Sequence, residues 1–481
     1  MDASSYEGSS TVLDATLNFI GSLIGAGIIG YGSAIAKAGG LVSLAAIIIF
    51  ATMNKYAFDL VIALSIETQR STSSFSVSFE NLGYAAFGTA GRLSVVVSKG
   101  LLIFGCLVVY IVVFKDNFSP SLLHLMYSHG NVADPTAYTS NWLAVLIQDS
   151  YLTTTVGTTL IIFPLILMRD VTPLARFSVV KLTIFGFVLC FLVHLFLINN
   201  SAEQEMTVSP WSIEGVHNNW LSVHAGVIGS LGTFLFGFTA QHTVNIVFES
   251  LKPELRTLDN WKKVSTRSTI VATAACVTVG YLVYMTFWER ADSNMFMLYQ
   301  PTVAVDVARL LLGISTLLTY PLPFFSLREL LISVVSGSAE EAAIAIADAD
   351  TAEYASQDIE TQGLLLLSNS VRKPIDIQRH NRCWWLIPGE DSQLIPSVHW
   401  TVTTTIYLAS LTLALHARSL GDVLNLVGCA TGTAIAFILP AIFSFRLKGY
   451  SHFSAFILLV GGSVGSLGTF LSLKAMLYGG Y

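Results

Sequence analysis

The chain has 481 residues, of which 53% are hydrophobic and 12% are charged. Soluble globular domains carry about 25% charged residues, so this composition excludes an ordinary soluble protein and predicts a chain that crosses a membrane many times. The net charge of -6 is spread without a basic run, which excludes a nucleic-acid-binding protein and a polybasic lipid anchor.

Long apolar segments recur along the whole chain. A hydrocarbon core about 30 Å thick needs about 20 apolar residues per helix, and eleven segments meet this requirement. The predicted spans are 14–36, 41–65, 93–114, 152–168, 178–198, 223–247, 267–288, 303–332, 398–416, 422–445 and 453–477. We therefore expect an all-α polytopic membrane protein with eleven transmembrane helices, in which Gly39 and Gly40 leave almost no loop between the first two spans.

The distribution of positive charge predicts the orientation. Cytoplasmic loops of membrane proteins carry an excess of lysine and arginine. If residues 1–13 form a cytoplasmic N-terminus, most of the 25 lysines and arginines of the chain fall on cytoplasmic loops. The two Asn-x-Ser/Thr sequons, at Asn117 and Asn199, then fall on outer loops and are predicted glycosylation sites.

The first span, "LNFIGSLIGAGIIGYGSAIAKAGG", is rich in glycine, the ordinary residue that least favours a helix. In lipid, non-helical backbone is tolerated only where it is buried in protein or lines a cavity. A span that unwinds at "GAGIIG" would expose N–H and C=O groups at membrane depth, where they could bind a ligand. Alternatively, Gly21-x-x-x-Gly25 could serve as a small-xxx-small helix packing motif.

The sixth span repeats this glycine pattern, which favours a helix break over a helix packing motif in both spans. It reads "GVIGSLGTFLFGFTAQHTVNIVF", with four glycines followed by Thr239, Gln241 and His242. Two interrupted spans, each first in a set of five, are the sequence signature of an inverted-repeat transporter with its site at the repeat interface. The N–H groups after the break would suit a carboxylate.

The eighth span carries charge inside an apolar segment. In "DVARLLLGISTLLTYPLPFFSLRE", Asp306 lies one turn before Arg309 and is its predicted ion-pair partner. The pair could orient the helix or act in gating. Ser315, Thr316 and Thr319 could offer hydroxyl oxygens to a cation, or bond back to their own helix.

The longest polar segment, 333–396, is acidic and alanine-rich and is predicted to be a cytoplasmic insert. Its composition is typical of a solvated linker. A regulatory or partner-binding role is the alternative.

These motifs resemble the amino acid/auxin permease superfamily, closest to its neutral amino acid branch of sodium-coupled and vacuolar transporters. The resemblance rests on the first span, on "SFENLGYAAFGTAGR" as the loop before the third, on "FGFTAQHTVNIVFESLKPELRTLDNWKKVSTRS" and on the eighth span. It implies a leucine-transporter-type fold of five plus five inverted spans, 14–198 and 223–445, with 453–477 added. It also implies amino acid symport or antiport driven by Na⁺ or H⁺, without a cofactor, at a plasma, vacuolar or lysosomal membrane.

By position, the resemblance implies a substrate site on the two broken spans. Its residues would be Ser22, Gly25, Ala26, Gly27 and Ile28 from the first span, and Phe236, Gly237 and Phe238 from the sixth.

The coupling ion is left open between Na⁺ and H⁺. Sodium-coupled relatives have a second Asn where this chain has Gly21, although Asn18 is kept, and a Thr where it has Leu317. Fewer oxygen ligands weaken a Na⁺ site, so proton coupling is an equal alternative. His242, just past the second break, is then the leading candidate because histidine titrates near neutral pH.

The alternative function is an amino acid sensor with the same fold that signals through the insert. Enzyme classes, by contrast, have no supporting motif. No His-Glu-x-x-His, aspartyl pair or nucleophile elbow predicts an enzyme. No metal site or structural disulfide is expected, because the five cysteines include no Cys-x-x-Cys. The expected partners are an amino acid and the lipid bilayer.

Overall fold

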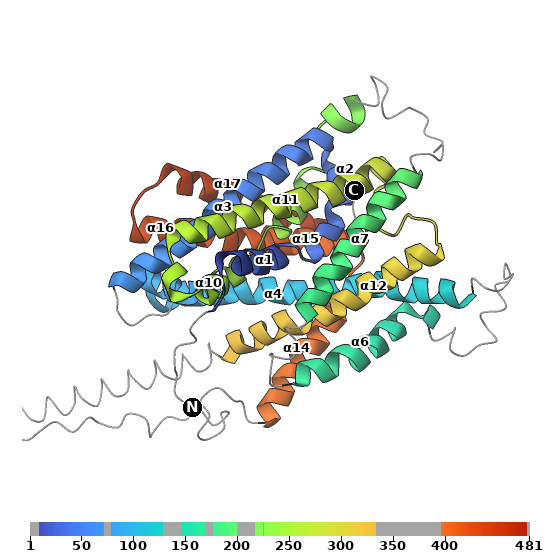
Figure 1. Cartoon of the computed structure of the whole chain (residues 1–481), viewed down its shortest axis with the longest axis horizontal. Coiled ribbons are helices and arrows are strands. Elements are labelled where there is room, and N and C mark those ends of the chain that lie inside the picture. The colour runs from blue at the N-terminus through green and yellow to red at the C-terminus, as the bar shows by residue number, and fades with distance from the viewer. Residues whose placement is uncertain are drawn as a thin grey trace, which may run out of the picture. The chain divides into compact units, whose positions relative to one another are not determined.

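The computed structural model describes residues 9–71, 78–127, 147–168, 177–199, 217–224, 226–332 and 396–478. Within these ranges the regular structure is helical, apart from one isolated bridge between Ser10 and Leu251. The chain divides into two compact units, Met1–Phe325 with Leu408–Tyr481, and Ser326–Tyr407. The first unit holds both interrupted spans and is described below (Figure 1).

A helix occupies each of the eleven predicted segments. In chain order these are α1 (Val12–Leu23) with the 3-10 turn η1 (Ala26–Gly30) and α2 (Tyr31–Ala38), α3 (Gly40–Ser71), α4 (Phe79–Tyr127), α6 (Ser150–Leu167), α7 (Phe177–Asn199), α9 (Ile228–Phe236) with α10 (Gln241–Ser250), α11 (Leu258–Phe287), α12 (Val303–Thr319), α14 (Pro396–His416), α15 (Leu420–Val427) with α16 (Leu439–Leu447), and α17 (His452–Tyr478).

Fewer helices are long and apolar enough to cross a membrane than the number of spans predicted from the sequence. In the described part of the chain, eight helices are long and apolar enough to cross a membrane, or nine if the bent pair α1 and η1–α2 is one span. The segments outside this count are α7, whose apolar part Thr183–Ile198 is shorter, and the short pair α9 and α10. The all-helical polytopic class is confirmed, whereas the number eleven stays a prediction.

The join between the first two spans is as short as predicted. Gly39 alone separates α2 from α3, with a φ of +95° that an L side chain rarely adopts. A Cβ there would lie 2.3 Å from the carbonyl oxygen of Ser222, so a side chain has no room. Conformation and crowding both require glycine at this turn.

The third span differs from its prediction at both ends. The expected loop 78–92 is helical from Phe79, and α4 deviates from helical geometry only at Phe87 and Gly88. At its far end α4 runs to Tyr127, through Pro120, instead of ending at 114. Apolar content alone set the predicted bounds, and polar residues such as Asn117 continue the helix because they pack against protein.

That extension corrects the placement of Asn117. Its side chain is 1% exposed within α4 and its Nδ2 donates to the carbonyl of Val113 at 2.8 Å. The predicted loop position is therefore wrong, because Asn117 lies inside α4. Glycosylation there stays a prediction, although a glycan acceptor must project from the surface. Asn199 is the last residue of α7, and its side chain lies outside the described residues.

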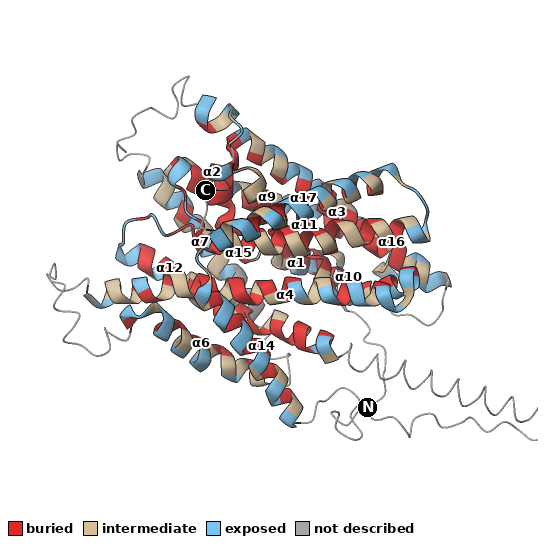
Figure 2. Cartoon of the chain, turned by 180° about the vertical axis from the view of Figure 1, so that it is seen from behind, coloured by how far each residue is buried: buried red, intermediate tan, exposed pale blue. Residues whose placement is uncertain are grey.

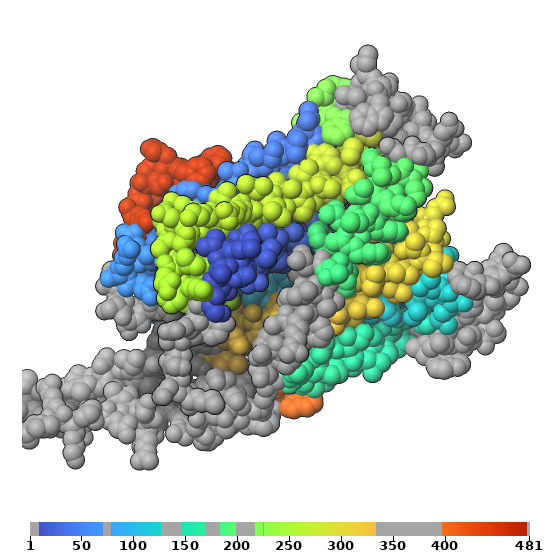
Figure 3. Space-filling view, viewed as in Figure 1, coloured from blue at the N-terminus to red at the C-terminus, as the bar shows by residue number. Residues whose placement is uncertain are grey.

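The half-helix α1 packs mainly on α11 and α10, whereas α12 packs chiefly on α4 and α7. The ring of Phe19 lies 5.1 Å from that of Phe58 and 5.4 Å from that of Trp261, which anchors α1 to α3 and α11. Figure 3 shows the remaining side of α1 at the molecular surface. Figure 2 shows buried residues concentrated where helices face one another and exposed residues along their outer sides.

Candidate substrate site at two broken helices

The first span breaks where the glycine pattern predicts. α1 ends at Leu23, Gly25 is extended with φ -113° and ψ -165°, and the chain resumes as η1 before α2 begins. The two parts are bent by 46°. The first N–H groups of a helical turn have no partner inside that turn, and the Ile28 N–H reaches the Gly25 carbonyl only at 3.4 Å. The break therefore leaves backbone donors available.

The sixth span breaks between Phe236 and Gln241. The Thr239 hydroxyl donates to the carbonyl of Leu235 at 2.9 Å, which satisfies one group freed at the end of α9. α10 then starts after Ala240, which supplies no side-chain cap. The N-terminal N–H groups of α10 thus form a second set of backbone donors.

The two breaks are in contact with each other. A Cβ at Gly27 would lie 2.9 Å from the Cα of Gly237 and 2.9 Å from the ring of Phe236. Gly27 needs glycine because a side chain there would push the two backbones apart, whereas a Cβ at Gly237 would clash with the ring of Tyr31. The structure thus brings together the two halves of the predicted site.

Tyr31, which no sequence motif singles out, lies against this contact from the α2 side. Its hydroxyl donates to the carbonyl of Phe234 at 2.8 Å, and a Cβ at Gly237 would lie 2.5 Å from that hydroxyl oxygen. Tyr31 is fully buried. A tyrosine within the glycine-rich run could have signalled this role, because a buried phenol needs a hydrogen-bond partner.

The predicted substrate residues separate into two groups. Ser22 and Gly25 are half-buried, and no heavy atom beyond the local backbone lies within 4 Å of the place where a Cβ at Gly25 would stand. By contrast, the other six residues are buried, namely Ala26, Gly27, Ile28, Phe236, Gly237 and Phe238. Open space therefore lies beside Gly25, whereas Gly27 packs against Gly237.

The oxygen-bearing residues predicted for a Na⁺ site come from two helices, α1 and α12. Asn18 is exposed on α1, and the Ser22 hydroxyl donates to its carbonyl at 3.2 Å. On α12, the Thr316 hydroxyl donates to Gly313 at 2.7 Å and the Thr319 hydroxyl to Ser315 at 2.8 Å. These two hydroxyls bond back to their own helix, as the alternative interpretation expected. Gly21 and Ser315 complete the predicted set, half-buried on α1 and buried on α12.

His242 lies in the first turn of α10 beside a buried amide pair. Gln241 Nε2 donates to Asn54 Oδ1 at 2.9 Å, which ties α10 to α3. The Nδ1 atom of His242 is buried and has no hydrogen-bond partner among the described residues. Unmet hydrogen-bonding capacity at a buried ring nitrogen is unusual and marks His242 as a place where a polar ligand could bind.

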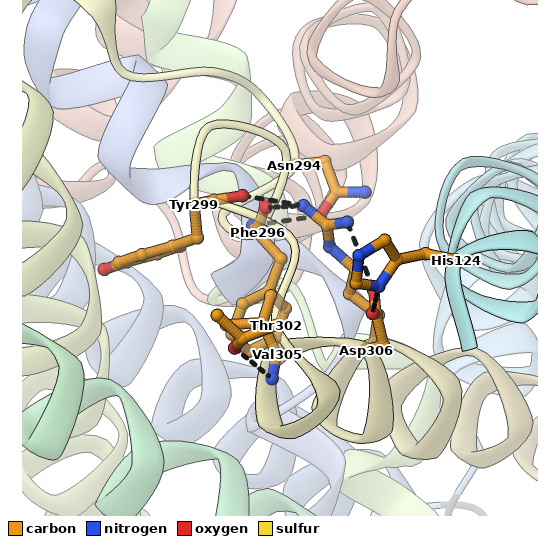
Figure 4. Close-up of polar contacts among 8 residues, drawn as sticks. His124, Asn294, Phe296, Tyr299, Thr302, Val305 and Asp306 are labelled. Atoms are coloured by element: carbon orange, nitrogen blue, oxygen red, sulfur yellow. Dashed lines mark hydrogen bonds and ion pairs between the residues drawn. The ribbon is translucent and has the colours of Figure 1, made fainter. Parts of the chain in front are cut away.

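The pair predicted on the eighth span belongs to a larger network (Figure 4). Arg309 Nη1 lies 3.7 Å from Asp306 Oδ1, and His124 Nδ1 contacts the other oxygen of the same fully buried carboxylate. The guanidinium also donates to the carbonyls of Phe296 and Tyr299, in the connection before α12. The network joins α4, α12 and that connection, and it does not include the residues at the helix breaks.

Asn425 is a second buried side chain that the sequence analysis missed. Its Oδ1 accepts the N–H of Gly232 at 2.8 Å, and its Nδ2 donates to Ser472 at 2.6 Å. A Cβ at Gly232 would lie 2.2 Å from the Asn425 carbonyl oxygen, so α9 and α15 approach closely. Two π-helical turns, Gly428–Gly432 and Ala434–Ile438, follow directly, and such turns are frequent at functional sites.

These features define a multi-pass membrane protein with a candidate site at two helix breaks that touch each other. The family model for transmembrane amino acid transporter protein matches residues 8–479, and the chain belongs to this family. The chain is accordingly an amino acid transporter-family membrane protein and not an enzyme.

Individual relatives are distant. Vacuolar amino acid transporter 2 of Saccharomyces cerevisiae is 22% identical, over 90% of this chain and 75% of that protein. A Mus musculus protein named as sodium-coupled neutral amino acid transporter 11 is 23% identical, over 93% of this chain and 92% of its own length. A solved Na⁺-coupled sialic acid symporter, in a substrate-bound outward-open state, is 12% identical with a TM-score of 0.48, covering 98% of this chain and 91% of that one.

Proposed function

We propose that the protein is a secondary active transporter that moves a neutral amino acid by alternating access around the two broken helices. The observation that carries this proposal is the contact between Gly27 and Gly237, because it places two interrupted spans against each other. Within transporter folds, paired interrupted spans form the substrate site at the interface of inverted repeats. The leucine-transporter-type arrangement of five plus five spans, with an eleventh added, is part of this proposal.

Backbone groups at the breaks account for recognition of an amino acid. The donors at the start of η1 would bind the carboxylate, since helix N-termini attract negative charge. Carbonyls freed at the ends of α1 and α9 would bind the ammonium group. The open space beside Gly25 would hold the main-chain part of the substrate. A site built from backbone is indifferent to the side chain, so the walls around it would set specificity.

We propose proton coupling through His242 as the version of this function. His242 has an unpartnered buried nitrogen directly after the second break. The Thr316 and Thr319 hydroxyls, by comparison, donate within α12, and the exposed Asn18 lies on α1. A hydroxyl that donates within its own helix keeps lone pairs for a cation, so these two bonds leave a Na⁺ site open. Na⁺ coupling is the competing outcome of the test below.

The test is uptake by purified protein in liposomes. Radiolabelled neutral amino acids are offered under an inward H⁺ gradient, an inward Na⁺ gradient, or neither. We expect accumulation driven by the H⁺ gradient that survives replacement of Na⁺ by a larger cation. His242→Gln should abolish concentrative uptake while leaving exchange of substrate at equilibrium. Failure to move any amino acid under either gradient would refute the transport function, and dependence on Na⁺ alone would refute the role of His242.

The predicted orientation completes the proposal, with the N-terminus and the 333–396 insert in the cytoplasm. Residues 333–395 of this insert lie outside the described residues. A sensor that signals through the insert would bind amino acid without net transport. Deleting 340–390 distinguishes the two functions, because a transporter should keep its uptake and a sensor would lose only its signal.

A further inference from the structure

The end of the molecule where α2 meets the start of the sixth span contains a histidine with two bonds to carbonyl groups. His224 Nδ1 lies 2.9 Å from the carbonyl oxygen of Ala36, in the last turn of α2. Its Nε2 lies 2.9 Å from the carbonyl oxygen of Asn218, in the turn η4 (His217–Leu221). One imidazole ring thus bridges the outer half of the first span and the segment that leads into the sixth.

Both partners of the ring are acceptors, which restricts its protonation state. A carbonyl oxygen cannot donate, and a neutral imidazole has one N–H, so it can satisfy only one of the two contacts. In the neutral ring, the second nitrogen would direct its lone pair at a carbonyl oxygen 2.9 Å away. The imidazolium, with an N–H on each nitrogen, makes both bonds and strengthens them by its charge.

The position of the ring at a helix end adds to this preference. The last carbonyls of a helix have no partner within it and carry the negative end of the helix dipole, which favours a cation. Ala36 is one of these residues, because α2 ends at Ala38. The backbone N–H of His224 also reaches the Ala38 carbonyl, at 3.4 Å.

The charged residues that the structure describes near the ring leave this preference in place. The neighbouring elements contribute Lys37 on α2, His217 on η4, and Glu289 with Arg290 on the turn after α11. Lys37 is exposed, so water screens its repulsion of a nearby cation. α3 has no charged residue before Lys55, and α11 has none after Arg267.

We propose that His224 is a proton-binding site that, when charged, ties the end of α2 to η4 and so holds the outer end of the two broken spans together. Loss of the proton removes one of the two bonds and loosens this end. The site would let the proton concentration of the outer compartment control the opening of the substrate path. This control deepens the proposed transport function, but the protonation of His224 is measurable without transport.

Hydrogen–deuterium exchange of the whole protein in detergent tests the site directly. Peptides covering 36–43 and 217–224 are followed at pH 6 and pH 8, with rates corrected for intrinsic exchange. Loss of a charge-assisted bond should raise corrected exchange in wild type by about tenfold at pH 8. His224→Gln should exchange fast at both pH values, and His224→Arg, which keeps the charge, should be protected at both.

His416→Gln is the matched control. His416 is exposed at the end of α14, and its Nδ1 contacts only one carbonyl, that of Thr412 at 2.8 Å, which a neutral ring satisfies. This variant should behave as wild type, and unchanged protection of α11 peptides shows that each variant is folded. A wild-type response below about twofold, or a response that survives in His224→Gln, overturns the proposal. A pH response without uptake would instead refute the transport function and leave the proton site standing.

Discussion

The backbones of Gly27 and Gly237 touch, although the two residues are far apart in the sequence, and a Cβ on the first would lie 2.9 Å from the Cα of the second. This contact joins the breaks of the first and sixth spans. Because both partners at the contact are backbone, neither can move aside as a flexible side chain would. The geometry of the candidate site therefore depends on the absence of a side chain at Gly27.

Substituting Gly27 and Gly25 should have opposite consequences. Gly27→Ala forces the two breaks apart and should destabilise the protein by about 1–3 kcal/mol, with loss of uptake. Gly25→Ala enters open space and should leave the melting temperature unchanged, whereas Gly25→Leu should block uptake without unfolding. Thermal unfolding and liposome uptake of the three variants check this. Equal melting temperatures for Gly27→Ala and Gly25→Ala would contradict the contact.

Removing the hydroxyl of Tyr31 should leave the buried carbonyl of Phe234 without its donor. The hydrogen bond is 2.8 Å long and fully buried, so Tyr31→Phe should cost about 1–3 kcal/mol. The measurement is the shift of the thermal unfolding midpoint. Tyr151→Phe, at an exposed position on α6, is the control and should cause no shift. A Tyr31→Phe midpoint equal to wild type would show that the hydroxyl bond contributes nothing.

The Asp306–Arg309 pair should show strong coupling in a double-mutant cycle. Asp306 is fully buried, so removing one partner leaves a buried charge and should cost about 3–5 kcal/mol. Combining Asp306→Asn with Arg309→Gln should cost less than the sum of the single changes. Unfolding midpoints and uptake are measured for all three variants. Additive effects would indicate that the two side chains act independently.

Asn425 should stabilise the contact of α9 with α15 through its side-chain oxygen. Asn425→Ala leaves the buried N–H of Gly232 without an acceptor and should cost about 1–3 kcal/mol. Ser472→Ala removes only the partner of the Asn425 amide and should cost less. Comparing the two unfolding midpoints tests the ranking. If Ser472→Ala lowered the midpoint more than Asn425→Ala, the hydrogen bond from Asn425 to Ser472 on α17 would be the more important one.

Asn117 should carry no glycan despite its sequon. Its amide is buried and bonded to the Val113 carbonyl. In a glycosylating host, Asn117→Gln should therefore leave the electrophoretic mobility of the protein unchanged. A faster-migrating variant would show that Asn117 is modified before α4 packs. Asn199→Gln tests the second sequon in the same gel.

The sequence by itself determined the class of the protein and the position of its helices. Apolar runs of about 20 residues leave few alternatives to membrane helices. The glycines of "GAGIIG" likewise located the break in the first span, because backbone conformation is set locally. The predicted helix bounds were wrong where they rested on apolar content alone. In α4, for example, the polar end remains helical through contacts with other helices.

Only the tertiary structure decided which groups meet. No local pattern shows that Gly27 faces Gly237, that Tyr31 spans the contact, or that the hydroxyls of Thr316 and Thr319 bond within their own helix. The ion pair on α12 was predictable from its one-turn spacing, whereas its third member, His124, comes from another helix. The sequence encodes the propensity of each segment, and the packing of segments distant in the chain decides the partners of each polar group.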